Sequence, residues 1–318
     1  MIRLIGTGSC MGDTLLSNSE LSKLVDTTDD WIKSRTGIEQ RFITKTTSAD
    51  DAVVNYAVEA SKNALENAKI SASDIDLVIV ATCTPGRNLP SVACRVQNKL
   101  GISKKCQAFD VSAACSGFTL ALHTARGLFL SCPEISKALI IGSEVISSIV
   151  DWNDRSTCVL FGDGAGAVIL ERSSSDVLFD TYFKSDGSFI NDLYSDPNTN
   201  FIKMDGKKVF TYAVVEMVNT IQYLLDRNKL DQSKISLLIP HQANLRIIES
   251  IGKKLEISSD KIIKTIDRHA NTSAASIPIA LDYANRNNFI KALDLVVLAS
   301  FGGGFAWGGA LFTWPIKV

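Results

Sequence analysis

The sequence predicts an α/β protein made of two similar halves, each with a largely parallel sheet covered by helices on both faces. Three observations support this fold class. The chain has 318 residues, of which 46% are hydrophobic and 21% charged, so it can bury a large core. Apolar strand-like runs alternate with segments of helical periodicity. One stretch of the chain also recurs further along it.

The repeat pairs "AKISASDIDLVIV" (68–80) with "NKLDQSKISLLIP" (228–240), and its apolar positions 70, 75, 77 and 79 match 230, 235, 237 and 239. Helix-like stretches flank both copies, at 50–68 and 90–101 and at 209–228 and 244–256. Because the period is so long, the repeat indicates a duplicated domain rather than a solenoid. We therefore divide the chain into an N-terminal half, residues 1–172, and a C-terminal half, residues 173–318.

The other elements follow in chain order. Residues 1–13 predict a first strand rather than a signal peptide, because glycines break a short apolar run that carries one basic residue. The strand-to-helix segment 109–122 corresponds to 266–281, and the strand 138–145 corresponds to 294–301.

Two glycine-rich segments predict turns next to buried strands. "FGDGAGAVILE" (161–171) resembles a dinucleotide-binding fingerprint, but a β-rich run follows it instead of a helix, so we expect a tight hairpin and no phosphate cradle. Residues 295–316 carry no charge and are long enough to span a membrane. Five glycines interrupt them, so we expect two buried strands joined by a glycine turn and no membrane insertion.

Charge and cysteine content exclude several classes of function. The net charge of −1 gives no overall field that would attract nucleic acid or an anionic membrane, so any anionic partner needs a local basic patch. The seven cysteines include no CxxC pair, which argues against a zinc module or a disulfide framework and fits a reducing cytoplasm.

Three candidate site residues lie where predicted strands end, which is where ligands bind in sheets of this kind. Cys115 follows the strand "QAFDV", His241 ends the strand "ISLLIP", and Asn271 lies at the matching strand-to-helix junction of the second half. Each also has a purely structural alternative. Cys115 could be a buried core thiol, His241 a packing residue, and Asn271 a helix N-cap. If the halves pack about a pseudo-dyad, all three face one crevice.

Cys115 is also placed to act as a nucleophile. It precedes the helical segment "SGFTLALHTARGLFL", and a thiol at a helix N-terminus is expected to have a lowered pKa. The alanines before it leave room for an acyl group.

Two local features suggest binding surfaces. Trp31 and Arg35 have helical i, i+4 spacing and could hold an adenine nucleotide, or they could lie on a solvated helix face. Arg246, Lys253 and Lys254 form a basic patch near His241, suited to an acidic protein or simply to a surface helix.

The combined motifs resemble the β-ketoacyl-acyl carrier protein synthase III family over essentially the whole chain. The motifs, in chain order, are "DVSAACSGF", "FGDGAGA", "IPHQANLRII", "DRHANTSAAS" and "SFGGGFAWGGAL", with "VDTTDDWIKSRTGIEQR" near the start. Each is weak alone, but together they are specific. The resemblance implies the thiolase fold, with duplicated βαβαβ halves in five αβαβα layers, which agrees with the independently detected repeat.

The resemblance also implies an activity and a set of roles. A short acyl-CoA, such as acetyl-CoA, would acylate Cys115, and the acyl group would condense with malonyl-acyl carrier protein to start fatty acid synthesis. His241 and Asn271 would complete the triad, and the N–H groups of Cys115 and Gly303 would form an oxyanion hole. Matching positions for CoA and its pantetheine arm are Thr27, Trp31, Arg35, Arg155, Gly206 and Asn244.

The resemblance further implies the partners of the enzyme. Arg246, Lys253 and Lys254 match the surface that binds acyl carrier protein, and the enzyme would be a cytoplasmic homodimer without metal or redox cofactor. Leu89 stands where many members have a phenylalanine that comes from the dimer partner and closes the acyl pocket. The leucine leaves acyl-chain length and branching preference open.

Three alternatives remain. One is a related thiolase-fold acyltransferase that uses Cys115 with a non-malonyl acceptor. Another is a cysteine hydrolase, since Cys, His and Asn also form a protease triad, although the duplication argues against it. The third is a non-catalytic module that binds carrier protein, which the complete set of Cys115, His241 and Asn271 argues against.

Overall fold

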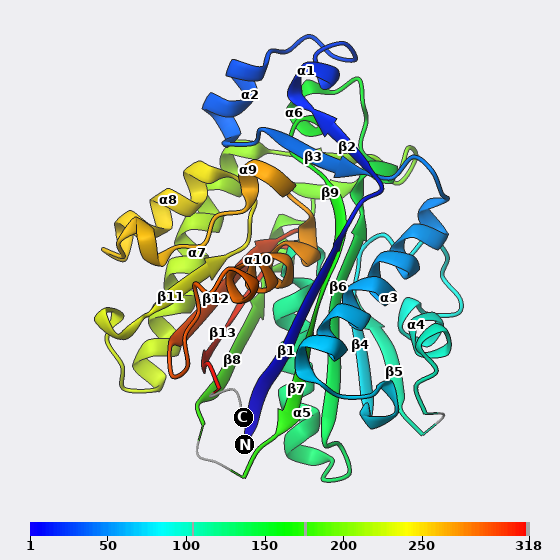
Figure 1. The fold of residues 1–318 in the computed structure, drawn as a ribbon. Helices are drawn as coiled ribbons and strands as arrows, with labels where there is room; N and C mark the ends of the chain where they lie inside the picture. The colour runs from blue at the N-terminus through cyan, green and yellow to red at the C-terminus, as the bar shows by residue number, and fades with distance from the viewer. Residues whose placement is uncertain (104, 175–176, 316–318) are drawn as a thin grey trace.

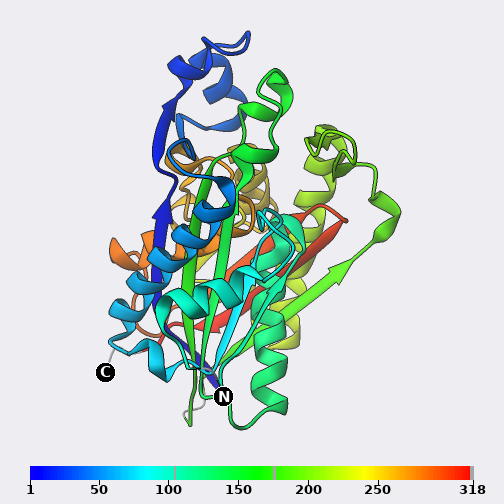
Figure 2. The same cartoon turned by 90° about the vertical axis from the view of Figure 1, so that its right-hand side faces the viewer.

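The chain folds into five layers of alternating helices and sheets (Figures 1 and 2). The computed structural model describes residues 1–103, 105–174 and 177–315. The long helices, in chain order, are α3 (Ala49–Ala68), α4 (Val92–Leu100), α5 (Gly117–Ser131), α7 (Gly206–Arg227), α8 (Leu245–Lys254) and α10 (Ser276–Arg286). The first two cover the first sheet, α5 and α10 lie between the sheets, and α7 with α8 covers the second sheet.

The two sheets have related strand orders. The first sheet, in spatial order, is β1 (Ile2–Met11), β7 (Asp163–Arg172), β6 (Lys137–Val145), β4 (Leu77–Ala81) and β5 (Gln107–Val111). The second is β11 (Leu237–Pro240), β12 (Leu295–Gly302), β13 (Ala306–Thr313) and β8 (Phe179–Ser185). Where β5 would have its counterpart, Leu238 and Ile262 form only a single parallel bridge. The division of the chain at residues 172 and 173, just after β7, remains our proposal.

Each sheet is mixed, so the expectation of largely parallel sheets is wrong. β4 runs parallel to β5 and β6, but β7 is antiparallel to both β6 and β1. In the second sheet only β11 and β12 are parallel. A parallel return needs a crossover of a dozen or more residues, usually a helix. β12 instead turns directly into β13, and only short helical turns join β6 to β7.

The structure confirms the prediction for one of the two glycine-rich segments and not for the other. Residues 295–313 form β12, a turn and β13, as predicted, and Ile316 of that segment lies outside the described residues. The segment 161–171 does not form a tight hairpin, because residues 146–162 separate β6 from β7. It does lead into a strand rather than a helix, so the expectation that it makes no phosphate cradle at a helix start agrees with the fold. Within the described residues, no helix has the length and apolar character needed to cross a membrane.

Smaller elements build the upper part of the molecule in Figure 1. β2 and β3 form a hairpin that carries α1 and α2, and β9 pairs with β10. Their bounds, with those of the two short helices α6 and α9, are β2 (Thr14–Ser17), α1 (Asn18–Leu21), α2 (Asp29–Thr36), β3 (Gln40–Ile43), α6 (Arg155–Cys158), β9 (Leu193–Ser195), β10 (Ile202–Met204) and α9 (Ile266–His269).

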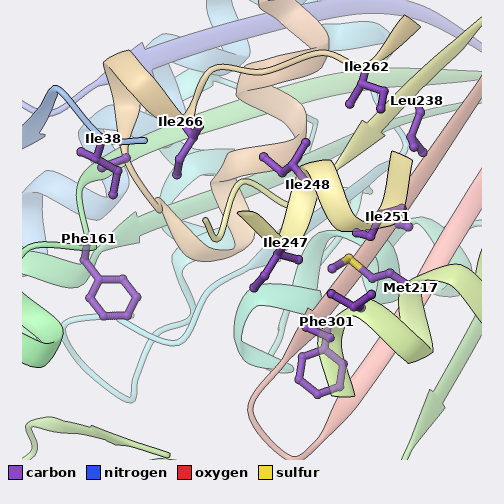
Figure 3. Close-up of a cluster of buried hydrophobic side chains, with 14 of the residues drawn as sticks. Ile38, Phe161, Met217, Leu238, Ile247, Ile248, Ile251, Ile262, Ile266 and Phe301 are labelled. Atoms are coloured by element: carbon purple, nitrogen blue, oxygen red, sulfur yellow. The ribbon is translucent and has the colours of Figure 1, made fainter. Parts of the chain in front are cut away.

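The core against α8 explains how that helix is oriented. Figure 3 shows Ile247, Ile248 and Ile251 of α8 near Met217 of α7 and Leu238 of β11, and all five are buried. Burying an isoleucine side chain contributes roughly 1.5–3 kcal/mol, so this face of α8 is fixed inward. The charged residues of α8 are therefore left on its outer face.

Candidate active site

A cavity of about 260 Å³ lies beyond the C-terminal ends of β5 and β11. The sequence-predicted residues that line it are Cys115, Gly206, His241, Asn244, Asn271 and Gly303. Cys115 follows β5 and His241 follows β11, as the strand-end argument predicts. The expectation of a strand before Asn271 is wrong, because α9 precedes this residue, which pairs with Phe161 through an isolated bridge. All three residues nevertheless line one cavity.

Cys115 lies in a single helical turn between β5 and α5. Ala114 before it has φ of 45°, a left-handed conformation that bulky residues rarely adopt. The glycine turn after β12 packs against this segment. A Cβ atom at Gly302 would lie 2.7 Å from the Cys115 backbone nitrogen, so glycine is needed for the close approach.

The pKa of Cys115 differs from the sequence-based expectation. The residue is half-buried, because the cavity reaches the thiol while protein surrounds the rest of it. Burial raises the pKa of the Cys115 thiol to about 11; hydrogen bonding to Ser273 offsets part of this shift, and the Glu144 carboxylate adds to it. The expectation of a lowered pKa is thus wrong, because the loss of hydration on burial is the largest influence on the pKa of this thiol.

His241 directly follows β11, and its ring is held from one side. Its backbone N–H donates to the Ala299 carbonyl oxygen at 2.8 Å, and its Nδ1 lies 2.6 Å from Ser276 Oγ. Burial lowers the pKa of the His241 imidazole to about 3, so the ring is neutral near pH 7. Among the described residues, His241 Nε2 makes no hydrogen bond, and this atom is the one free for a substrate.

Asn271 is also fixed through one side-chain atom. The Ser273 N–H donates to its Oδ1 at 2.8 Å, and its backbone bonds to Leu160 and Gly162. The sequence left open that Asn271 is only a helix N-cap, and this hydrogen bond resembles such a cap. However, it closes a short turn and does not cap α10, whose N-cap is Ala275. With Oδ1 occupied as an acceptor, the Asn271 amide presents its NH₂ group as the donor, and no protein acceptor for that group lies in the described ranges.

Sequence reasoning missed a second cysteine in the cavity. The thiol of Cys83 donates to the buried Glu144 carboxylate at 3.3 Å, and its sulfur lies 4.0 Å from Ser273 Oγ. Burial raises the pKa of both Cys83 and Glu144. The signal was available, since Cys83 follows the strand "DLVIVA" and occupies a strand end. Ser273 and Ser276 lay in the motif "DRHANTSAAS", where nothing local distinguishes them from other serines.

Several other residues predicted to bind substrate lie at the upper end of the molecule, in and near α2 and α6. The Arg155 guanidinium carbon lies 4.9 Å from the centroid of the Trp31 ring, so this indole stacks with Arg155 from α6 and not with Arg35, its neighbour on α2. Arg155 also donates to the Asp26 carbonyl oxygen. Thr27 Oγ1 is buried and has no hydrogen-bond partner among the described residues.

α8 is tied to α2 at this end. Asn244 Nδ2 donates to the Arg35 carbonyl oxygen at 3.2 Å, and Arg246 donates to the Ser34 carbonyl oxygen at 3.0 Å. Lys253 and Lys254 are exposed near the other end of α8, and Leu89 is 83% exposed. None of these three lines the cavity.

Comparison of the sequence with known proteins identifies the protein family of this chain. Residues 109–187 match the family described as 3-oxoacyl-[acyl-carrier-protein (ACP)] synthase III, and residues 225–314 match its C-terminal counterpart. A β-ketoacyl-[acyl-carrier-protein] synthase III from Alkalilimnicola ehrlichii is 46% identical over 97% of this chain and 98% of its own length. The chain belongs to the β-ketoacyl-[acyl-carrier-protein] synthase III family. It is therefore an acyltransferase-type condensing enzyme.

Solved structures of this family share the fold. The 3-oxoacyl-[acyl-carrier-protein] synthase III of Aquifex aeolicus is 42% identical, covers 99% of this chain and 100% of its own, and has a TM-score of 0.94. The enzyme from Pseudomonas aeruginosa is 35% identical, covers 100% and 99% respectively, and has a TM-score of 0.92. The predicted thiolase fold of this synthase III is confirmed.

Proposed function

We propose that this synthase starts fatty acid synthesis by condensing a short acyl-CoA, such as acetyl-CoA, with malonyl-acyl carrier protein. The products are 3-oxoacyl-acyl carrier protein, CoA and CO₂, and an acyl thioester of Cys115 is the intermediate. One observation carries the proposal. Cys115, His241 and Asn271 line a single cavity, in which the protein binds one polar atom of His241 and of Asn271 and leaves the other free.

The first half-reaction transfers the acyl group to Cys115. Its sulfur attacks the thioester carbonyl carbon, the bond from that carbon to the CoA sulfur breaks, and the thiol proton leaves with CoA as its free thiol. We assign the oxyanion hole to the N–H groups of Cys115 and Gly303, which lie in the same cavity. One such donor contributes roughly 3 kcal/mol to transition-state stabilisation.

The second half-reaction uses His241 and Asn271. Loss of CO₂ from the malonyl thioester leaves an enolate, whose oxygen needs hydrogen-bond donors. His241 Nε2–H and the Asn271 NH₂ group supply two donors from uncharged side chains. The enolate carbon then attacks the acyl carbonyl carbon, the bond from that carbon to the Cys115 sulfur breaks, and the Cys115 thiolate takes up one proton from solvent to restore the thiol. Neither half-reaction, as proposed, needs a metal or a redox cofactor.

We assign the upper end of the molecule to CoA. Trp31 and Arg155 already stack on each other, which prepares a flat, cationic surface for adenine and phosphate. Arg35 and Thr27 lie in or beside α2, and the Thr27 hydroxyl, which has no hydrogen-bond partner among the residues described, is the proposed contact for a polar group of CoA. Gly206 and Asn244 line the route inward and are the proposed pantetheine contacts.

We assign the outer face of α8 to acyl carrier protein. Arg246, Lys253 and Lys254 are exposed there because the isoleucines of α8 hold its opposite face in the core. The basic patch on a chain of net charge −1 suits an acidic carrier.

We further propose a cytoplasmic homodimer. β5 is an edge strand with only β4 beside it, and the unpaired N–H and C=O groups of an edge strand can pair with a second copy. The exposed Leu89 would then reach the acyl pocket of the partner. All seven cysteines are free thiols, which suits a reducing compartment.

A two-step assay tests the function. The enzyme is incubated with acetyl-CoA, and mass spectrometry follows an acetyl adduct on the peptide that contains Cys115. Malonyl-acyl carrier protein is then added, and CO₂ and the acetoacetyl product are measured. The proposal expects both steps. An acetyl adduct without condensation would indicate an acyltransferase that uses another acceptor. The absence of an acetyl adduct from every cysteine would refute the proposal.

A further inference from the structure

Ser276 holds His241 from the side opposite the substrate. It is the first residue of α10 and is 2% exposed. Its Oγ lies 2.6 Å from His241 Nδ1, and the Gln242 backbone N–H donates to the same Oγ at 3.3 Å. Ser276 Oγ has no third hydrogen-bond partner within the residues that the structure describes.

Counting protons decides the direction of the short bond. A serine hydroxyl has one proton to donate and two lone pairs. The Gln242 N–H occupies one lone pair. If Ser276 donates to Nδ1, its buried hydroxyl proton is used, and the donor that stays unpaired is the Nε2–H of His241, a residue that lines the cavity. If Nδ1–H donates instead, the buried Ser276 proton is left without an acceptor, and burying an unpaired donor is unfavourable. The first arrangement requires the ring proton of His241 to be on Nε2.

Gln242 makes this arrangement rigid. Its side-chain NH₂ group donates to the Pro240 carbonyl oxygen at 2.7 Å and to the Ile263 carbonyl oxygen at 3.3 Å. Its Oε1 accepts from the Thr265 N–H at 2.8 Å. Gln242 and the three residues that its side chain contacts are all buried. The Gln242 backbone N–H, which donates to Ser276, therefore has little freedom to move.

We propose that Ser276 is a positioning residue that keeps His241 in its Nε2–H tautomer, so that His241 is a hydrogen-bond donor to the malonyl thioester. This inference rests on the proposed function. Because the ring is neutral, its tautomer decides whether Nε2 donates or accepts. Ser276 would therefore act in the decarboxylation step, where a donor is needed, and not in the acylation of Cys115.

The test compares the two half-reactions in Ser276→Ala. Acylation is followed by mass spectrometry with acetyl-CoA. Decarboxylation is followed separately in a Cys115→Ala background, as CO₂ released when malonyl-acyl carrier protein becomes acetyl-acyl carrier protein with uptake of one proton. We expect Ser276→Ala to lower decarboxylation by ~10–100-fold and to change acylation by less than ~3-fold. Ser276→Cys, which keeps a weaker donor of similar size, is expected to give an intermediate decarboxylation rate.

A matched control and a direct readout separate positioning from folding. Ser61→Ala removes a buried hydroxyl whose hydrogen bond is also 2.6 Å long, but in α3, and it should alter neither half-reaction. The chain has only three histidines, so ¹⁵N spectra of histidine-labelled enzyme can be assigned with single variants. The His241 ring should show a proton on Nε2 in the wild type, and this signal should change in Ser276→Ala.

Two results would overturn the inference. One is an equal loss of acylation and decarboxylation in Ser276→Ala, and the other is a wild-type ring that carries its proton on Nδ1. Failure of the proposed function looks different, because the wild-type enzyme itself would then form no acetyl-Cys115 or release no CO₂.

Discussion

His241 and Asn271 each have one side-chain atom bound by the protein and another left for a substrate. For His241 the bound atom is Nδ1, and for Asn271 it is Oδ1. This division turns two ordinary neutral side chains into oriented donors. Cys115 differs, because its reactivity depends on how strongly burial resists formation of the thiolate.

Asn271→Ala should separate the two half-reactions. Removal of the amide leaves Cys115 and its surroundings in place, so acylation by acetyl-CoA is expected to stay within about threefold of wild type. Decarboxylation of malonyl-acyl carrier protein should fall on the order of 100-fold, the usual effect of losing one donor to an oxyanion. Rapid-quench measurement of acetyl-enzyme, alongside CO₂ release, checks this. An equal fall in both rates would contradict the role given to Asn271.

The raised pKa of Cys115 predicts a distinct pH dependence. Below a pKa of about 11 the thiolate fraction rises about tenfold for each pH unit, so alkylation of Cys115 by iodoacetamide should accelerate steadily from pH 7 to 10. The measurement is the rate of modification of the Cys115 peptide by mass spectrometry, with the exposed Cys94 as an internal comparison. A rate that levels off near pH 7 would mean that the helix N-terminus outweighs burial.

At the scale of elements, glycine turns and small residues let segments from the two halves approach each other. The turn after β12 touches the backbone at Cys115, and the single turns before α5 and α10 contain the left-handed residues Ala114 and Ser273. Close backbone contact of this kind fixes Cys115 relative to the second half of the chain.

Gly302→Ala should therefore damage the site more than the fold. The new Cβ would meet the Cys115 nitrogen at 2.7 Å and displace the turn. We expect acylation to slow at least ~10-fold, since small misplacements of reacting groups are costly. Gly127→Ala in α5 is the matched control, because nothing lies within 4 Å of its Cβ, and it should stabilise the enzyme by roughly 0.5–1 kcal/mol with unchanged activity. Thermal melts and the acylation assay test both variants, and normal acylation in Gly302→Ala would contradict the argument.

At the scale of the whole molecule, two mixed sheets enclose the middle helices (Figure 1). The residues that follow β5 and β11, one strand from each half, line one cavity. In the proposed function, the acidic carrier approaches from outside, over the charged face of α8. Since the chain as a whole has almost no net charge, we expect binding of the carrier to depend on this local patch.

Replacing Lys253 and Lys254 by glutamate, which reverses their charge, should weaken binding of malonyl-acyl carrier protein without affecting the reaction with acetyl-CoA. We expect KM for malonyl-acyl carrier protein to rise by about tenfold at low salt, because like charges now repel the acidic carrier, and the difference should shrink as salt is added. Acylation by acetyl-CoA should not change. Lys229→Glu with Lys234→Glu, at the far end of β11, is the charge-matched control. An equal rise in KM for both pairs would rule out a specific docking role for α8.

The amino-acid sequence alone was enough to predict the repeat, most helices and strands, and the positions of Cys115 and His241 after strands. It also singled out Asn271, although the strand expected before that residue does not form. Hydrophobic periodicity is a local property, so α3, α7 and the β12–β13 pair could be predicted from it. The direction of β7, the pKa of Cys115, the stacking of Trp31 on Arg155, and the contacts of Ser276 and Cys83 could be known only from the folded chain. These depend on which groups from distant parts of the chain meet and on how much water they lose, and no local pattern of residues records either.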